Sequence, residues 1–261
     1  MTPFLSHLLP FSWAITHNQV PEYLVIQLLH HENPDIAVAA AQGVWYVEPE
    51  RSVRPSFRAD WQNVIVEKAI DQFWLSEVFQ SDSQLAYEWL EARLRNTSDL
   101  YRIDYGRDAP AAINTLDIEA KRRLLHQIQN DYESVRLLTL IVNNDLDLYR
   151  ELLSIERLHE FHLAPLAGNP EGIWLDKATL ALGAGYTPEQ VARSVHGILD
   201  VITWTGSEAA MWKDWIERFD QLRLHEDERI RQIGIAGKEI SNSRMQRAQE
   251  RERREAIYGR E

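Results

Sequence analysis

Two segments near opposite ends of the chain have similar sequences. Residues 27–43 read QLLHHENPDIAVAAAQG, and residues 221–237 read QLRLHEDERIRQIGIAG. Each segment has the pattern of two helices joined by a short polar turn, and the two turns lie 194 residues apart. The recurrence of one junction in a chain favours a fold with repeated helical units. Aligned without gaps, the segments share Gln27/Gln221, Leu28/Leu222, His31/His225, Glu32/Glu226, Ile36/Ile230 and Gly43/Gly237.

Signals for helix starts recur between these segments. Asn33 is a good N-cap, Pro34 suits the first helical position, and Asp35 complements the helix dipole. Thr187 and Gln190 occupy the two positions of a capping box. Further helix starts are predicted at residues 81–83, 114–115 and 169–171, and a helix stop at residues 183–185.

Apolar residues between these signals follow helical spacing. Leu85, Trp89 and Leu90 form one stripe, and Leu124, Leu125 and Ile128 form another. Alternation with a period of two never persists long enough to predict a sheet. The sequence therefore predicts an all-α fold with eleven or twelve helices.

The repeated junction resembles that of HEAT and armadillo repeats. The resemblance rests on paired leucines, a polar turn with Asn33 or Asp227, a β-branched residue, and small residues at 39–41 or at Gly234 and Gly237. It implies an irregular HEAT-like solenoid over residues 1–237, in which the small residues allow close helix packing. A repeat of about 39 residues would place the two junctions five units apart. A single irregular helical bundle is the alternative.

Residues 238–261 differ in composition from the rest of the chain. They contain seven basic and five acidic residues and few apolar ones. Glu and Arg at helical spacing support an exposed helix. The segment is predicted to be a charged C-terminal capping helix with a tail, and a helix that docks a partner is the alternative.

Composition restricts the classes of function. The net charge of −12 disfavours broad binding to nucleic acid or anionic lipid. The chain contains no cysteine, which excludes disulfides and thiolate chemistry and fits a cytoplasmic location. No uncharged run approaches the roughly 18 to 20 residues of a membrane helix, so no membrane association is expected.

No catalytic set and no cofactor are predicted. His31–Glu32 and His225–Glu226 could each be an acid–base pair, but their recurrence in the repeated junction indicates turn residues. Glu156, His159 and His162 are weak candidates for a metal site. The two histidines are three residues apart, whereas the zinc-protease motif requires a spacing of four.

Two surfaces are binding candidates. Arg51, Arg54 and Arg58 surround Phe57 in a segment where two prolines predict a loop, and such a set suits phosphate or carboxylate recognition. The second candidate comprises Trp204, Trp212 and Trp215. If exposed, these tryptophans would form a protein-binding hot spot, and otherwise they are core residues.

The expected function is a non-enzymatic helical-repeat scaffold that binds another macromolecule, in the first place a protein. The chain is also compatible with the C-terminal repeat region of a larger multidomain protein. One alternative is a nucleic-acid-binding solenoid that uses the loop from Arg51 to Arg58, which the net charge disfavours. A second alternative is a helical-bundle enzyme with a metal near His159 and His162. The sequence predicts no oligomeric state.

Overall fold

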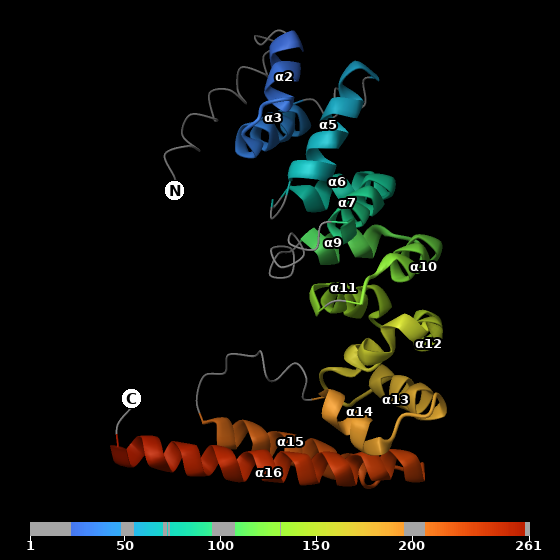
Figure 1. Ribbon diagram of the computed structural model, residues 1–261, viewed down its shortest axis with the longest axis vertical. Helices are drawn as coiled ribbons and strands as arrows, with labels where there is room; N and C mark the ends of the chain where they lie inside the picture. Colours follow the sequence, from blue (N-terminus) through green and yellow to red (C-terminus); the bar gives the residue numbers. More distant parts are fainter. Residues whose placement is uncertain are drawn as a thin grey trace. The chain divides into compact units, whose positions relative to one another are not determined.

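A computed structural model describes residues 22–47, 55–69, 72, 74–95, 108–130, 132–195 and 207–258 (Figure 1). Every regular element within these ranges is helical and none is a strand, so the all-α prediction is confirmed. The described residues already form more helices than the eleven or twelve expected. The chain separates into two compact units, residues 1–140 and residues 141–261.

The first unit contains short helices that pack against near neighbours in the sequence. Helix α2 contacts α3 and α5, α5 contacts α3 and α7, and α9 contacts α6 and α7. Helix α10 also packs on α7. The helices are α2 (Glu22–Leu29), α3 (Pro34–Val47), α5 (Pro55–Lys68), α6 (Leu75–Ser81), α7 (Ser83–Arg95), α9 (Asp108–Thr115) and α10 (Ile118–Gln127), followed by α11 (Tyr132–Val142) at the division between the units.

Tryptophans connect helices in the first unit. The indole Nε1 of Trp61 in α5 donates to the carbonyl of Ala41 in α3 at 2.9 Å. Trp89 in α7 donates in the same way to the carbonyl of Ala69, just beyond the end of α5, at 2.8 Å. Both indole rings are buried, so each hydrogen bond satisfies a donor that the core would otherwise leave without a partner.

The second unit contains a long helical hairpin and a layer of shorter helices. Helices α15 and α16 run antiparallel side by side, and α14 packs on α16 (Figure 1). Gly234 of α16 lies so close to α15 that a Cβ there would be 2.8 Å from the carbonyl oxygen of Phe219. The elements are α12 (Leu146–Ser154), η1 (Glu156–Phe161), η2 (Ala164–Leu166), α13 (Ile173–Gly183), α14 (Pro188–Val195), α15 (Glu208–Leu222) and α16 (Glu228–Tyr258).

Several predicted helix starts are confirmed at the level of hydrogen bonds. Gln190 N donates to Thr187 Oγ1 at 3.2 Å, and Thr187 N donates to Gln190 Oε1 at 2.8 Å, which completes the capping box. Asp82 accepts from Leu85 N at the start of α7, within the predicted range 81–83. Helix α13 ends at Gly183 as predicted, and Gly185 follows with φ of 99°.

Two predicted helix starts are wrong. Thr115 is the last residue of α9, and α10 starts at Ile118 because Asp117 caps it by accepting from Ala120 N at 2.7 Å. The start expected at residues 169–171 lies at Ile173 instead, because Gly172, with φ of 57°, turns the chain before the helix begins.

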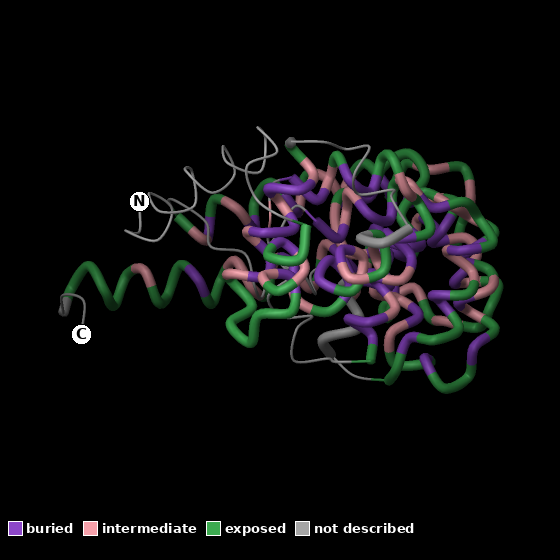
Figure 2. The backbone as a smooth tube through the Cα atoms, turned by 90° about the horizontal axis from the view of Figure 1, so that it is seen from above, coloured by how far each residue is buried: buried purple, intermediate pink, exposed green. Residues whose placement is uncertain are grey.

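Helix α16 continues without a break across residues 237 and 238, where the sequence placed a division between the repeat domain and a charged tail. The compact units divide between residues 140 and 141. The C-terminal part of α16 is largely exposed, as the green tube near the label C in Figure 2 shows. The change in composition at residue 238 therefore lies within one continuous helix, whose largely exposed part starts at about residue 246.

Candidate functional site

The arginine-rich binding candidate begins outside the described residues. Arg51 and Arg54 are not described, nor is the side chain of Phe57. Helix α5 starts at Pro55, so Arg58 lies in a helix and not in the predicted loop. The Arg58 guanidinium is half exposed and lies 3.5 Å from the Asp82 carboxylate. Arg58 therefore already has an acidic neighbour within the chain.

The tryptophan candidate is part of the core of the helical hairpin. Trp212 and Trp215 are only 3% and 9% exposed, so they pack within the chain and form no exposed aromatic surface. Arg244 of α16 lies over the Trp212 ring at 5.0 Å, and Arg218 lies over the Trp215 ring at 5.2 Å. Trp204 falls outside the described residues.

The start of α15 is attached to the C-terminal part of α16. Ser207 caps α15 by accepting from Ala210 N, and its hydroxyl donates to the Glu252 carboxylate at 2.9 Å. Glu252 also accepts from Ala209 N at 3.2 Å. A carboxylate at a helix N-terminus is favoured by the helix dipole. The acidic residue thus holds the two helices of the hairpin together at its open end.

Of the three candidate metal residues, His162 forms a hydrogen-bonded cluster with Tyr186 and two backbone carbonyls. The buried His162 ring places Nε2 3.0 Å from the carbonyl of Ile155 and Nδ1 2.8 Å from the Tyr186 hydroxyl. Since Nε2 faces a carbonyl, Nε2 carries the proton and Nδ1 accepts from Tyr186. The Tyr186 hydroxyl also lies 3.2 Å from the His159 carbonyl. Glu156 and His159 themselves are exposed.

Burial keeps this cluster uncharged. It lowers the pKa of His162, and the hydrogen bond to the Ile155 carbonyl opposes that shift only in part. Burial also raises the pKa of the Tyr186 hydroxyl, and the nearby Glu156 carboxylate raises it further. The pKa of Tyr149 is raised strongly by its deeper burial. A neutral imidazole hydrogen-bonded to the protonated Tyr186 phenol is therefore the stable state near neutral pH.

The cluster does not have the arrangement of a metal centre. Both ring nitrogens of His162 are engaged by groups of the chain itself, so a metal ion would have to displace one of them. Within the described ranges, no group of three or more histidine, aspartate and glutamate side chains is placed to hold a metal ion.

Two buried cations that the sequence analysis missed also bind backbone carbonyls. Arg93 donates to the carbonyl of Ala69 at 3.1 Å, beside the Trp89 indole that shares this acceptor. Lys177 in α13 lies 3.4 Å from the carbonyl of Pro165, and burial lowers the pKa of its amine. The sequence feature that could have indicated the burial of Lys177 is its position three residues after the buried Trp174, on the apolar stripe of α13.

The first of the two repeated junctions is held by four hydrogen bonds around His31 and Asn33. His31 N donates to the carbonyl of Leu28 at 3.1 Å, and Asn33 N donates to His31 Nδ1 at 3.0 Å. Asp35 N then donates to Asn33 Oδ1 at 2.9 Å, and Ala37 N donates to the Asn33 carbonyl at 3.3 Å. The histidine closes the end of α2, and the asparagine caps α3.

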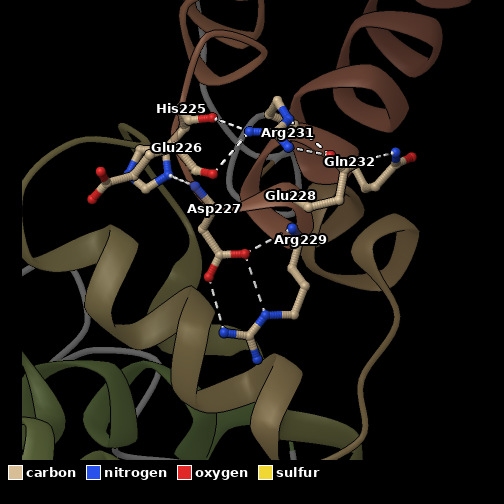
Figure 3. Close-up of polar contacts among 7 residues, drawn as sticks. All are labelled: His225, Glu226, Asp227, Glu228, Arg229, Arg231 and Gln232. Carbon is tan, nitrogen blue, oxygen red and sulfur yellow. Dashed lines mark hydrogen bonds and ion pairs between the residues drawn. The ribbon is translucent and has the colours of Figure 1, made fainter.

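The second junction has the same four hydrogen bonds. His225 N donates to the carbonyl of Leu222 at 3.0 Å, and Asp227 N donates to His225 Nδ1 at 3.1 Å (Figure 3). Arg229 N donates to Asp227 Oδ1 at 2.8 Å, and Arg231 N donates to the Asp227 carbonyl at 3.1 Å. The sequence repeat is therefore a structural repeat at both junctions, and both histidines serve as hydrogen-bond acceptors in turns.

The second junction carries additional arginine contacts (Figure 3). Arg231 donates to the carbonyls of His225 and Glu226 at 2.7 and 2.8 Å, and it also pairs with Glu228. Hydrogen bonds from Arg229 lower the pKa of the Asp227 carboxyl. At the first junction Ala37 occupies the position of Arg231, so these contacts are specific to the C-terminal hairpin.

In comparisons with known proteins, no family model, curated protein or solved structure matches the chain. Among the described residues, no helix combines the length and the apolar character required to cross a bilayer.

Proposed function

We propose that this chain is a non-enzymatic helical-repeat scaffold that binds another protein. The observation that carries the proposal is the recurrence of one helix–turn–helix junction, with the same four hydrogen bonds, at residues 28–37 and 222–231. Helical pairs joined in this way stack in solenoid proteins, where successive units display side chains at fixed intervals along a continuous surface. Display of this kind is the mechanism we assign to the chain.

The contacts of the buried polar side chains support the same proposal. His162, Arg93 and Lys177 are titratable or cationic groups in buried positions, and each one lies within hydrogen-bond distance of a backbone carbonyl near the end of a helix. His31 and His225 likewise accept hydrogen bonds in the turns. These side chains fix the geometry of helical junctions, which is what a scaffold requires of them.

The test is capture of a protein partner on the immobilised full chain. A native lysate is treated with nuclease and washed at moderate salt, and bound proteins are quantified against the bait. The proposal predicts a stoichiometric partner whose chemical crosslinks reach several helical pairs of the chain. It is overturned if nothing binds stoichiometrically, or if nuclease treatment removes all binding, since the partner would then be a nucleic acid.

A pair of double variants checks whether junction geometry matters for binding. Asn33→Ala with Asp227→Ala removes both capping side chains, and partner capture should decrease. Glu32→Ala with Glu226→Ala changes exposed side chains in the same turns without removing any of the four hydrogen bonds, and capture should be retained. Equal capture by both double variants would contradict a role for the repeated junction.

A further inference from the structure

The face of α16 that points away from α15 carries a regular series of exposed residues. They are spaced by three or four positions over six turns, so they form one straight stripe along the helix. All of them are exposed, whereas Ile230, Ile233 and Gly237 on the opposite face are buried. We call this stripe the outer seam, and it consists of Ile235, Glu239, Ser243, Gln246, Glu250, Arg253 and Ile257.

The outer seam is self-complementary about Gln246. Ile235 and Ile257 lie 11 residues before and after this position, and Glu239 and Arg253 lie 7 residues before and after it. If two copies of α16 align antiparallel about Gln246, each Ile235 faces the other copy's isoleucine at 257. Each Glu239 then faces an arginine at 253. A two-fold interface requires such a pattern, because the same surface must complement itself.

The residues of these pairs have no partner within the described part of the chain. Ile235 and Ile257 are 38% and 64% exposed, although isoleucine is more often buried. The side chains of Glu239 and Arg253 are exposed and take part in no hydrogen bond or ion pair among the described residues. The apolar and the charged positions are therefore both available to a second molecule.

From this arrangement we infer that the outer seam of α16 is a self-association surface, and that its occupant is a second copy of this chain docked antiparallel about Gln246. Two isoleucine pairs and two Glu–Arg pairs form in the symmetric dimer. Because the remaining seam residues are polar and exposed ion pairs contribute little to binding, the dimer is weak. A dissociation constant on the order of micromolar or above is expected.

One residue of α16 should weaken the dimer, so its replacement is expected to strengthen association. Arg247 is exposed and lies one position from the axis at the edge of the seam, so its symmetry mate lies on the same side of the interface, displaced by only about 3 Å along the helix axis. Replacing it by glutamine removes a like-charge repulsion, and the dimer should become about threefold tighter.

The main experiment is sedimentation equilibrium of the full chain over a broad range of concentration. Wild type should show a reversible monomer–dimer equilibrium that weakens as salt is added. Glu239→Arg alone and Arg253→Glu alone should each weaken association about tenfold, because each places like charges opposite one another in both pairs. An equimolar mixture of the two single variants, and the double variant E239R/R253E, should recover wild-type association because both restore opposite charges.

Crosslinking locates the axis, since the chain has no cysteine of its own. Gln246→Cys should crosslink to a dimer with a short bismaleimide. Gln232→Cys, an exposed glutamine on the same face of α16, should not. The two copies of position 232 would be about 42 Å apart at 1.5 Å per residue.

Three outcomes overturn the inference: a chain that remains monomeric at every concentration, a double variant as weak as the single ones, or equal crosslinking at positions 232 and 246. The substitutions are on the surface, and circular dichroism of each variant at low concentration verifies that the fold is intact. The measurement uses the isolated chain, so its result is independent of whether a heterologous protein is captured.

Discussion

Phe219 of α15 lies directly against the backbone of Gly237 in α16. A Cβ built at residue 237 would be 2.2 Å from the Phe219 ring, a distance that no real contact allows. The sequence analysis expected Gly237 to permit close packing of two helices, and this expectation is confirmed. The absence of a side chain at this position is what lets the aromatic ring fill the space between the helices.

Gly237→Ala should therefore destabilise the chain. The added methyl must displace a buried aromatic ring, and overpacking of this kind costs about 1–3 kcal/mol. Chemical denaturation followed by circular dichroism measures the loss. Gly183→Ala is the matched control, because a Cβ at residue 183 meets no atom within 4 Å. Equal stability of the two variants would show that Phe219 moves aside without cost.

The repeated junction predicts matched effects of capping substitutions. Asn33→Ala should lower the free energy of unfolding by about 1 kcal/mol, because the N-terminal N–H groups of α3 lose their side-chain acceptor. Asp227→Ala should lower the unfolding midpoint in the same direction, since Arg229 N loses the equivalent acceptor. Hydrogen exchange should localise the faster opening to the first turn of α3 or of α16. Exchange unchanged in both turns would contradict this account of the caps.

The hairpin of α15 and α16 should weaken in acid. Hydrogen bonds from Lys238 and Arg223 hold the pKa of Asp220 below its ordinary value of 3.8. A carboxyl with a depressed pKa in the folded state contributes stability above its ordinary pKa, and this contribution is lost as pH falls through the folded pKa. Thermal unfolding at a series of acidic pH values should show a smaller loss for Asp220→Asn than for wild type. Parallel pH profiles would contradict the prediction.

His162 should make the stability of the folded chain depend on pH in a second, higher pH range. Burial lowers its pKa below the ordinary value of 6.5, so the unfolded chain binds a proton more readily than the folded chain. Stability is therefore complete above pH 6.5 and decreases as pH falls toward the lowered pKa of the folded state. His162→Gln removes this titration and should flatten the profile in that window. The exposed His159 provides the control, and His159→Gln should leave the slope in place.

The sequence was sufficient for features that depend on local chemistry. Helical spacing predicted the all-α fold, and the cap at Asn33 and the box of Thr187 and Gln190 were confirmed. Where two residues compete to cap one helix, the prediction was wrong. Thr115 and Asp117 are both good N-caps, but Thr115 is the last residue of α9 and Asp117 caps α10.

Features that depend on contacts distant in sequence could not be predicted. Nothing near Tyr186 in the sequence indicates that its hydroxyl meets His162, 24 residues earlier. The hydrogen bond between Arg93 and the Ala69 carbonyl also spans 24 residues. The same limit applies to Trp212 and Trp215, because the sequence could not decide whether their side chains are exposed or part of the core. Both are buried, and Arg244 of α16 lies over the Trp212 ring.

The two buried cations that sequence reasoning missed should respond differently to removal. Arg93 donates to the Ala69 carbonyl and stacks on the Trp89 ring at 5.3 Å, so Arg93→Met should destabilise the chain by about 2 kcal/mol. Lys177 has one long hydrogen bond, to the carbonyl of Pro165, and no carboxylate within ion-pair distance among the described residues. Burial therefore costs its charge more than this bond returns, which is why its pKa is lowered. Lys177→Met should leave stability unchanged or raise it, as measured by denaturant unfolding at neutral pH. A large loss of stability in Lys177→Met, comparable to that of Arg93→Met, would mean that the lysine is essential to the packing of α13 on η2.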